Sequence, residues 1–550
     1  TPAAPAEQPW PLLSMSHSFD YVIVGAGVAG VSCLYELLYQ IDHRGLRGCG
    51  DAVATVALIS SSDVAQGVRT VQQHSKRVAE LALASHDLTS LAAAHANLTT
   101  LQGEVLRLTP ESRSLLYKPA GGANRLPSAG EQEVATVRYR QGLCLCCGAV
   151  PSRPLPPSPH VAVVRDTASI QDLAARLSQA ARVVMVGNGG IALELAHALT
   201  SVQELIWVVK DSHIGHAFFD EDAADFLASQ LPDCGPAAHA QKGPGDLRVA
   251  RAWSLCAAKN HGPDTLGQTP YGSASGPAWL SLLQKAHGGE PSGALSPPPH
   301  ITLEILTQIS RLEQEHRPGR APGAIVTLGN GKCYKDIDIV ICATGVEPAT
   351  HWLPASLPRA DDGGLIVEHT MRCQGCTDIY GAGDCCTAVW PQQARQWFQM
   401  RLWTQARDMG VLAAQRMSGL EDELAMGFAF ELFTHCTRFC GLKVVLLGLY
   451  NAQRLDGEPQ GDVISYTRET RPQHGPGDDN HTPGSAENGP TYVKIVLLRG
   501  RLQGALLIGE TNLEETFENL ILDGIDVSHL GASILEPEHI NGLDLEDYFD

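Results

Sequence analysis

The chain alternates short apolar runs with amphipathic stretches, and two of the apolar runs break into spaced glycines. Residues 21–24 form an uninterrupted β-rich run that predicts a buried parallel strand. Gly25, Gly27 and Gly30 follow with G-x-G-x-x-G spacing, and residues 31–39 continue as a predicted helix. In such a turn the first glycine permits the bend, the second lets backbone approach a pyrophosphate, and the third lets the helix pack on the strand. The pattern predicts a nucleotide site, with an ordinary glycine turn of an α/β unit as the alternative.

A second unit of the same kind begins at residue 182. The apolar run 182–186 predicts a strand, and Gly187, Gly189 and Ala192 then have G-x-G-x-x-A spacing. The next predicted strand, 205–209, arrives about twenty residues later, as a βαβ unit requires. Two independent units in one chain favour two nucleotides held face to face.

The residue at the end of the second strand of each unit differs from the one that usually contacts the ribose of the nucleotide. An acidic residue usually holds the ribose hydroxyls at this place in the first unit. Ser60 stands there instead, and a serine can still make one hydrogen bond. In the second unit, an acid at the strand end favours NAD and an arginine favours NADP. Lys210, followed by Asp211, therefore leaves both nucleotides open.

The remaining pattern predicts further elements and one domain boundary. The proline-rich stretch 151–159 marks that boundary. Residues 71–94 read as a helix, whereas 233–299 read as a mostly irregular Gly/Pro-rich insertion. We expect later strands at 336–342, 378–381, 443–449, 492–498 and 503–508, and helices within 392–417 and 513–522.

Composition restricts the classes of partner and compartment. A formal net charge of −20 argues against direct binding to nucleic acid or to an anionic membrane surface. No apolar stretch reaches the roughly 18 to 20 residues that span a bilayer. The 15 cysteines are an odd number and fall mostly in apolar runs, which suits free thiols in a reducing compartment.

The order of the motifs resembles that of the pyridine nucleotide-disulphide oxidoreductases, the flavoprotein reductases with two dinucleotide sites. The resemblance rests on the two glycine motifs, then Ala343-Thr344-Gly345, then Gly381-Ala382-Gly383-Asp384. It implies FAD on the first unit and NAD(P)H on the second. It also implies that Asp384 contacts the ribityl and pyrophosphate region of FAD, and that the chain crosses between domains at the turns ending in Gly148 and Gly345, with Thr344 in the second. Glu194 would orient the nicotinamide amide; the alternative is a carboxylate favoured by the helix dipole.

We therefore expect an α/β fold with two Rossmann-like dinucleotide-binding domains and an α+β C-terminal domain. A disordered leader would occupy 1–17. The FAD-binding domain would combine 18–150 with 335–425, and the NAD(P)-binding domain would span 151–334, including the insertion 233–299. The C-terminal domain would cover 426–535, and an acidic tail 536–550 would follow.

Other stretches resemble one branch of this family more narrowly. They are 187–194, 400–407, 443–448, 509–520 and 545–550, and the last three lie outside the nucleotide motifs. This resemblance implies a nuclear and cytoplasmic flavoprotein that protects the RNA ligase of tRNA splicing against oxidation, and thus a protein partner in that ligase complex. The tail, with carboxylates between apolar side chains, is either a docking peptide for such a partner or a solvated end.

The redox-active cysteine pair of disulfide reductases is absent from the expected places. Residues 68–94 and 181–210 contain no cysteine, although a dithiol is needed both to attack and to resolve a mixed disulfide. We therefore expect no catalytic cysteine pair, and hydride transfer from NAD(P)H to flavin by the cofactors themselves. The alternative is a flavin-bearing binding module whose redox state gates association with a partner.

Four further features leave alternatives open. Cys373 and Cys376 predict a hairpin with two exposed thiols, or else a redox or metal pair. The vicinal pairs 146–147 and 385–386 favour small apolar packing, and because no two well-spaced ligand pairs occur we expect no metal site. His435 is either a buried structural histidine or a general base.

Overall fold

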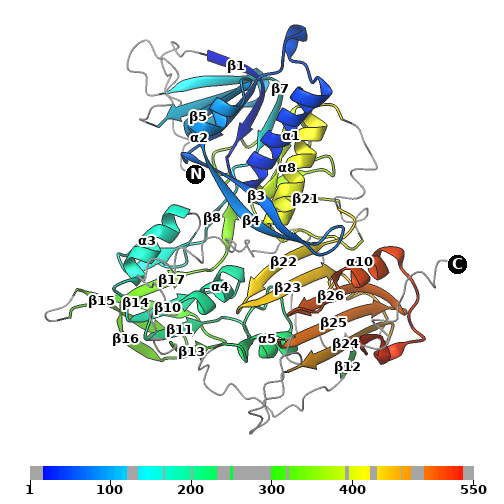
Figure 1. The fold of residues 1–550 in the computed structure, drawn as a ribbon. Helices are drawn as coiled ribbons and strands as arrows, with labels where there is room; N and C mark the ends of the chain where they lie inside the picture. The colour runs from blue at the N-terminus through cyan, green and yellow to red at the C-terminus, as the bar shows by residue number, and fades with distance from the viewer. Residues whose placement is uncertain are drawn as a thin grey trace, which may run out of the picture.

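Three larger β-sheets organise the chain, one in the upper part of Figure 1 and two side by side below it. The computed structural model describes residues 16–120, 134–164, 167–199, 202–231, 248–251, 299–317, 321–390, 395–420, 430–459, 461–471 and 489–536. Most of the predicted leader, most of the insertion 233–299 and the tail beyond Glu536 lie outside these ranges. The α/β fold class predicted from the sequence is confirmed.

The first sheet is built around β1 (Ser16–Val24), which begins two residues inside the predicted leader. β1 pairs in parallel with β2 (Val56–Ser60) on one side and with β7 (Ala135–Leu145) on the other. β5 (Leu98–Thr109) extends the sheet beyond β2, and β20 (Ile379–Gly381) extends it beyond β7. β6 (Ser114–Pro119) runs antiparallel to the C-terminal half of β5 and to the N-terminal end of β7. The parallel strands are almost wholly buried, which explains their continuous apolar sequence.

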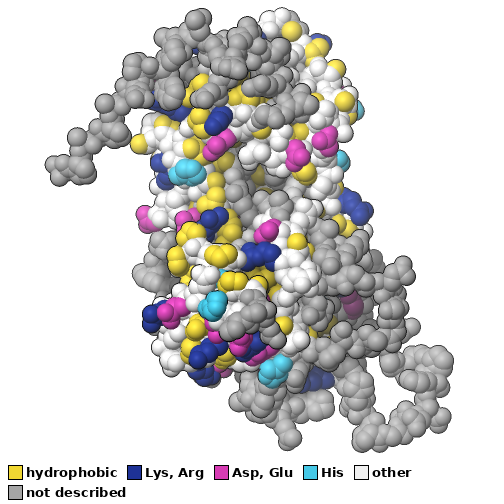
Figure 2. Space-filling model, turned by 90° about the vertical axis from the view of Figure 1, so that its left-hand side faces the viewer, with side chains coloured by type: hydrophobic (Ala, Val, Ile, Leu, Met, Phe, Trp, Pro, Cys, Tyr) yellow, Lys and Arg dark blue, Asp and Glu magenta, His cyan; other side chains and the backbone are white. Residues whose placement is uncertain are grey.

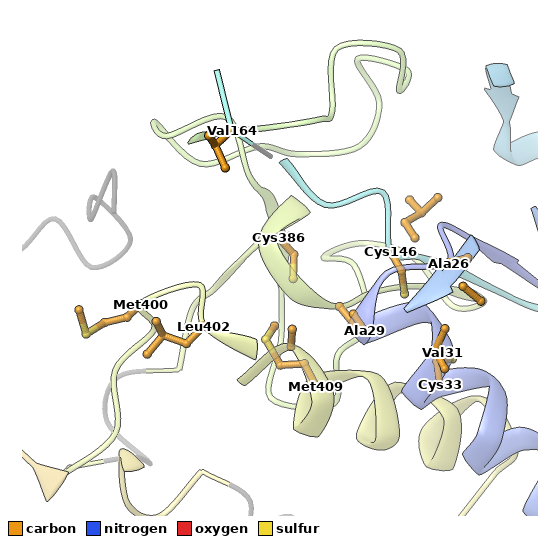
Figure 3. Close-up of a cluster of buried hydrophobic side chains, with 14 of the residues drawn as sticks. Ala26, Ala29, Val31, Cys33, Cys146, Val164, Cys386, Met400, Leu402 and Met409 are labelled. Atoms are coloured by element: carbon orange, nitrogen blue, oxygen red, sulfur yellow. The ribbon is translucent and has the colours of Figure 1, made fainter. Parts of the chain in front are cut away.

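Two helices, α1 (Val28–Arg44) and α8 (Trp403–Met417), pack side by side on this sheet (Figure 1). Their backbones approach closely at Gly410, where a Cβ atom would lie 2.2 Å from the carbonyl oxygen of Ala29. Figure 3 shows Ala29 and Cys33 of α1 and Met409 of α8 in one apolar cluster. The return segment after residue 378 therefore completes the first unit.

The second sheet has the order β13-β11-β10-β17-β9, with every pair parallel. Helices α3, α4 and α5 accompany it, and a three-stranded antiparallel sheet, β14-β15-β16, packs against it. The bounds are β9 Val161–Val163, α3 Thr167–Leu177, β10 Arg182–Val186, α4 Gly190–Ala198, β11 Glu204–Val208, α5 Glu221–Ala228, β13 His300–Glu304, β14 Ile309–Glu315, β15 Gly323–Leu328, β16 Cys333–Ile337 and β17 Ile339–Cys342.

The predicted boundary at residues 334 and 335 is wrong. β16 and β17 both belong to the second unit, because β17 pairs with β10 and β9 rather than with the first sheet. The chain returns only after β17. There β18 (Val346–Pro348) pairs antiparallel with β8 (Ala149–Pro151), so the outgoing and returning segments run side by side.

The third sheet is antiparallel and has the order β12-β24-β25-β26-β23-β22. Its edge strand β12 (Arg248–Arg251) comes from the insertion predicted to be mostly irregular, so that region contributes at least one strand to the C-terminal sheet. The other bounds are β22 Thr434–Phe439, β23 Leu442–Gly448, β24 Val463–Thr470, β25 Thr491–Leu498, β26 Arg501–Ile508 and α10 Glu514–Asp523. Smaller elements are η1 Cys49–Asp51, η2 Pro110–Ser112, β19 Leu365–Val367, η3 Gly383–Cys385, β21 Cys386–Ala388 and η4 Gly531–Leu535.

The helix predicted at 71–94 is mostly wrong. β3 (Val64–Gln73) and β4 (Ala79–Asp87) form an antiparallel hairpin, and only α2 (Leu88–Ala94) is helical. Residues 79–84 contain good helix formers, but tertiary contacts override that weak preference. The hairpin reaches from the first unit to β22 (Figure 1), where Val78 joins the apolar core of the C-terminal domain. The Ser75 hydroxyl and the Arg77 main-chain N–H both donate to the buried Glu518 carboxylate.

Candidate functional site

The first glycine turn has the backbone geometry that its spacing predicts. Gly25 has φ +108°, and a Cβ atom there would lie 2.1 Å from the carbonyl oxygen of Cys146. A Cβ atom on Gly30 would lie 1.8 Å from the carbonyl oxygen of Gly25. Both positions therefore exclude any side chain. These contacts close the turn against the end of β7 and seat α1 on the sheet.

Gly27 has the opposite surroundings. It is exposed, and nothing lies within 4 Å of the position that a Cβ atom would take. It is also the N-cap of α1, and no side chain caps the helix there. The positive end of the helix therefore faces open space, next to a backbone that a phosphate can approach closely.

The second turn repeats this arrangement. Gly187 has φ +137°, and a Cβ atom there would lie 2.0 Å from the carbonyl oxygen of Ala343 at the end of β17. Gly189 is the uncapped N-cap of α4, with nothing within 4 Å of its Cβ position. Ala192 is fully buried where the first turn has a glycine. In each unit, therefore, one glycine is closed, meaning that a strand end leaves no room for a Cβ atom. A second glycine is open, meaning that nothing fills its Cβ position, and it lies at the start of a helix.

Asn188, inside the second turn, is a residue that the sequence reasoning missed. Its amide nitrogen donates to Asp211 Oδ2 at 2.8 Å and to the carbonyl of His213 at 2.9 Å. Its Oδ1 accepts a hydrogen bond from the Gly215 N–H. The turn is thereby tied to the loop after β11. Lys210 lies in that loop with an exposed side chain, while Asp211 faces the turn.

Glu194 lies on α4 and Ser60 ends β2. Glu194 is 2% exposed on α4, the helix that packs against β22 of the C-terminal domain. Ser60 is buried at the end of β2, where its hydroxyl accepts a hydrogen bond from the Ser62 N–H at 3.1 Å. The Ser60 oxygen is therefore engaged in the local turn.

The two crossing segments meet close to the first turn. Gly148 has φ +64° and open space at its Cβ position. On the returning segment, Gly345 has φ +90°, and the Thr344 hydroxyl donates to the carbonyl of Ser152 at 3.2 Å. The Ser152 N–H in turn donates to the Gly345 carbonyl at 2.9 Å. These bonds hold the two crossings together at the end of the first sheet.

The turn that carries Asp384 also packs against the first glycine turn. Gly383 has φ +77°, and a Cβ atom there would lie 2.9 Å from the Cβ atom of Ala29 in the first turn of α1. The Cys385 thiol donates to the carbonyl of Leu145 in β7 at 3.2 Å. Asp384, between them, is partly exposed. The structure thus brings Gly27, Gly148 and Asp384 to the same end of the first sheet, from three distant parts of the sequence.

The residues present fit a dinucleotide at each turn. The open glycines and the uncapped helices supply backbone N–H donors and partial positive charge for a pyrophosphate. The turn that carries Asp384 packs beside the first turn, and the cationic Lys210 follows the second unit's β11. These groups are of the kinds suited to binding and orienting a nucleotide.

Among the cysteines of the described residues, hydrogen bonds from neighbouring thiols lower the pKa values of the buried Cys144 and Cys385, whereas the Cys373/Cys376 pair has no activated thiol. The hairpin that replaces the predicted helix contains no cysteine. Cys373 is buried, not exposed as the hairpin hypothesis predicted, and burial raises the pKa values of both Cys373 and Cys376. Of the vicinal cysteines, Cys146, Cys385 and Cys386 are buried, consistent with apolar packing. No group of three metal-binding side chains converges in the part of the chain that the structure describes.

The surroundings of His435 favour a buried structural histidine over a general base. It is 8% exposed on β22, and burial lowers its pKa to about 4. Neither ring nitrogen has a hydrogen-bond partner among the described residues. A buried imidazole whose pKa lies so far below 7 is a weak base, so it is poorly suited to accept a proton as a general base near pH 7.

The structure also shows a cavity away from the two glycine turns and a mixed distribution of surface charge. A cavity of about 420 Å³ lies between the hairpin, α8 and β22, and its lining includes Lys76, Thr404, Arg407 and Leu432 but none of the predicted nucleotide-site residues. On the face shown in Figure 2, Lys and Arg side chains are interspersed with Asp and Glu. Within the described ranges, none of the helices combines the length and the apolar character needed to cross a membrane.

The chain is similar to known proteins over nearly its whole length. The family model "Pyridine nucleotide-disulphide oxidoreductase" matches residues 19–240 and 300–410. The human pyridine nucleotide-disulfide oxidoreductase domain-containing protein 1 is 34% identical, over 96% of this chain and 98% of the human protein. The Dictyostelium discoideum protein of the same name is 31% identical, over 96% of this chain and 99% of its own length.

Among solved structures, the water-forming NADH oxidase from Lactobacillus brevis bound to NADH superposes with a TM-score of 0.58. It is 16% identical, and the match covers 93% of this chain and 92% of the oxidase. An NAD-dependent persulfide reductase from A. fulgidus gives a TM-score of 0.59 at 14% identity, covering 94% of this chain and 78% of the reductase. At such identities the likeness establishes the fold.

Proposed function

Because the chain belongs to the pyridine nucleotide-disulphide oxidoreductase family, we propose that it is an NAD(P)H oxidoreductase that holds FAD on the first glycine turn and NAD(P)H on the second. The observation that carries the proposal is the repeated turn geometry. In each unit one glycine is closed against a strand end, and the next is open at an uncapped helix.

The residues of the chain bind and orient. The N–H groups at the start of α1 would hold the FAD pyrophosphate, Gly148 would leave room for the cofactor, and Asp384 would accept hydrogen bonds from its hydroxyl groups. On the second unit, the start of α4 would hold the NAD(P)H pyrophosphate, Asn188 keeps the turn rigid, and Glu194 would orient the nicotinamide. When bound, FAD supplies the hydride-accepting chemistry.

The lack of cysteine in the hairpin limits the reaction. In the described residues the hairpin stands where disulfide reductases carry their redox helix, and it has no cysteine. Electrons from NAD(P)H would therefore pass from the flavin directly to an acceptor.

Anaerobic addition of NADH, then NADPH, to the purified yellow protein tests this function. Bleaching of the flavin absorbance, or a long-wavelength charge-transfer band, is the expected result, and it ranks the two nicotinamides. No change with either nucleotide contradicts the proposal. That outcome favours the second candidate, a flavin-bearing module whose redox state gates a partner, which is consistent with the hairpin that has no cysteine.

We further propose, from the resemblance in sequence, that the protein acts in nucleus and cytoplasm and protects the RNA ligase complex of tRNA splicing from oxidation. Its acidic tail would dock to that partner through the apolar side chains of Leu543, Leu545, Tyr548 and Phe549. Deleting residues 541–550 should abolish capture of the ligase complex while flavin content and reduction by NADH stay normal. Unchanged capture would contradict the role of the tail.

A further inference from the structure

Arg401 lies beneath the turn that carries Asp384. The residue is 5% exposed, so its guanidinium is withdrawn from solvent. Nε donates a hydrogen bond to the main-chain carbonyl of Asp384 at 3.1 Å. Nη2 donates to the Asp362 carboxylate and, at 3.1 Å, to the Thr387 hydroxyl. One side chain therefore connects the Asp384 turn with two other segments.

The partners of Arg401 are themselves fixed. Thr387 is fully buried, and its hydroxyl donates to Asp362 Oδ1 at 2.8 Å and to Oδ2 at 3.0 Å. The Gly364 N–H donates to Asp362 Oδ1 at 2.9 Å. The guanidinium is thus paired with a carboxylate whose own orientation is set by Thr387 of β21 and by the main chain at Gly364.

The main chain at Arg401 is held in an unusual conformation. Its φ is +53°, in the left-handed region that residues with a Cβ atom rarely occupy. Neighbouring glutamines hold the segment in place. Gln399 accepts from the Ala388 N–H and donates to the Cys386 carbonyl, both at 2.9 Å, and Gln405 accepts from the Met400 N–H at 2.8 Å. Such a conformation persists only where the surroundings over-determine it.

We infer that Arg401 is a positioning residue for the FAD site, acting through the main chain of Asp384. Its Nε fixes the Asp384 peptide in a turn that packs against the first turn of α1, and the peptide in turn sets the direction of the Asp384 side chain. Without this donor, a main-chain carbonyl in a tightly packed turn loses its partner, and the turn relaxes. A lysine keeps the charge but lacks the planar fork that bonds the Asp384 carbonyl and Asp362 together.

The inference rests on the proposed FAD site, and three variants test it. Arg401→Met removes all donors, Arg401→Lys keeps the charge, and Thr387→Val removes only the hydroxyl that ties Asp362 to Nη2. Arg182→Lys is the matched control, because Arg182 also pairs with a carboxylate, Glu204 at 2.6 Å, but in the second unit. The measurements are titration of the apoprotein with FAD and hydrogen exchange of the 381–388 peptide.

We expect Arg401→Met to bind FAD about tenfold or more weakly, with faster exchange in 381–388 both with and without FAD. Arg401→Lys and Thr387→Val should show smaller losses, and Arg182→Lys should match the wild type. If Arg401→Met does not fold, Thr387→Val carries the test. A wild-type chain that fails to bind FAD overturns the proposed function. If the wild type binds FAD and every variant binds it with the same affinity, only the role of Arg401 is overturned.

Discussion

Nζ of Lys494 lies 2.8 Å from Oδ2 of Asp220, and this ion pair joins the C-terminal sheet to the second nucleotide unit. Lys494 is fully buried on β25, and Asp220 is the N-cap of α5. Burial alone would raise the pKa of Asp220, but the charge and hydrogen bond of Lys494, together with the Ala223 N–H and the charge of His213, outweigh burial and lower it. Asn451 completes the contact, because its Oδ1 accepts from Lys494 at 2.7 Å and its amide donates to the Phe218 carbonyl. These polar contacts fix the orientation of the two parts across an aromatic interface.

Removing one member of this pair should destabilise the protein strongly. Lys494→Met leaves the Asp220 carboxylate buried without its partner, which costs about 3–5 kcal/mol. The measurement is the urea midpoint of the unfolding transition, followed by far-UV circular dichroism. The exposed Lys76→Met is the control and should change the free energy of unfolding by less than about 0.5 kcal/mol.

The double variant Lys494→Met with Asp220→Asn separates charge from packing. It removes both charges, so it should be more stable than Lys494→Met alone. Equal losses in the single and double variants would show that packing, rather than the unpaired carboxylate, dominates.

The open glycines allow the two nucleotide sites to be blocked independently. Gly27→Val should leave the fold intact, because open space surrounds that Cβ position, but should weaken FAD binding about tenfold or more by obstructing the phosphate. Gly189→Val should retain flavin and slow its reduction by NAD(P)H. Flavin content and stopped-flow reduction measure the two effects.

Gly457→Val is the control for both glycine variants, since Gly457 is also open and exposed but lies in a distant loop. Normal flavin binding in Gly27→Val would contradict the FAD site on the first turn, and loss of flavin from Gly189→Val in addition would reverse the assignment of the two sites.

His435 should make the protein sensitive to acid. Burial lowers its pKa from 6.5 to about 4, so the folded state resists a proton that the unfolded chain accepts. The neutral form dominates in both states above pH 6.5, and the stability present there is lost as the pH falls toward 4. The loss amounts to about 3 kcal/mol for this group. His435→Leu should therefore flatten the dependence of the urea midpoint on pH between 6.5 and 4.

The control for this effect is His86→Gln, which removes an exposed histidine of the hairpin. Its pH dependence should match the wild type. An identical slope in His435→Leu would exclude His435 as the group responsible.

We expect the protein to take up two electrons per flavin in a reductive titration. A flavin together with a redox-active disulfide would take up four electrons, but burial raises the pKa values of both Cys373 and Cys376, so this pair has no activated thiol. Anaerobic titration with dithionite, followed by absorbance, should reach its end point at one two-electron equivalent. Uptake of a second equivalent, lost in a Cys373→Ser variant, would establish a redox disulfide.

The glycine motifs determined much of the fold by themselves. Gly25, Gly30 and Gly187 occupy backbone positions that only glycine tolerates, and such positions depend on a few neighbouring residues. Local spacing therefore predicted both βα turns, the two units and the class of cofactor site, although Ser60 and Lys210 left the nucleotide choice open.

Only the tertiary structure decided where distant segments meet. The sequence predicted a helix at 71–94, but docking of Val78 and the bond to Glu518 stabilise a hairpin instead. Arg401 and Asp384 are 17 positions apart with no motif between them, and β17 proved to belong to the second unit. Local sterics set the backbone of a turn, whereas strand partners and buried polar contacts depend on free energies gained only when the whole chain is packed.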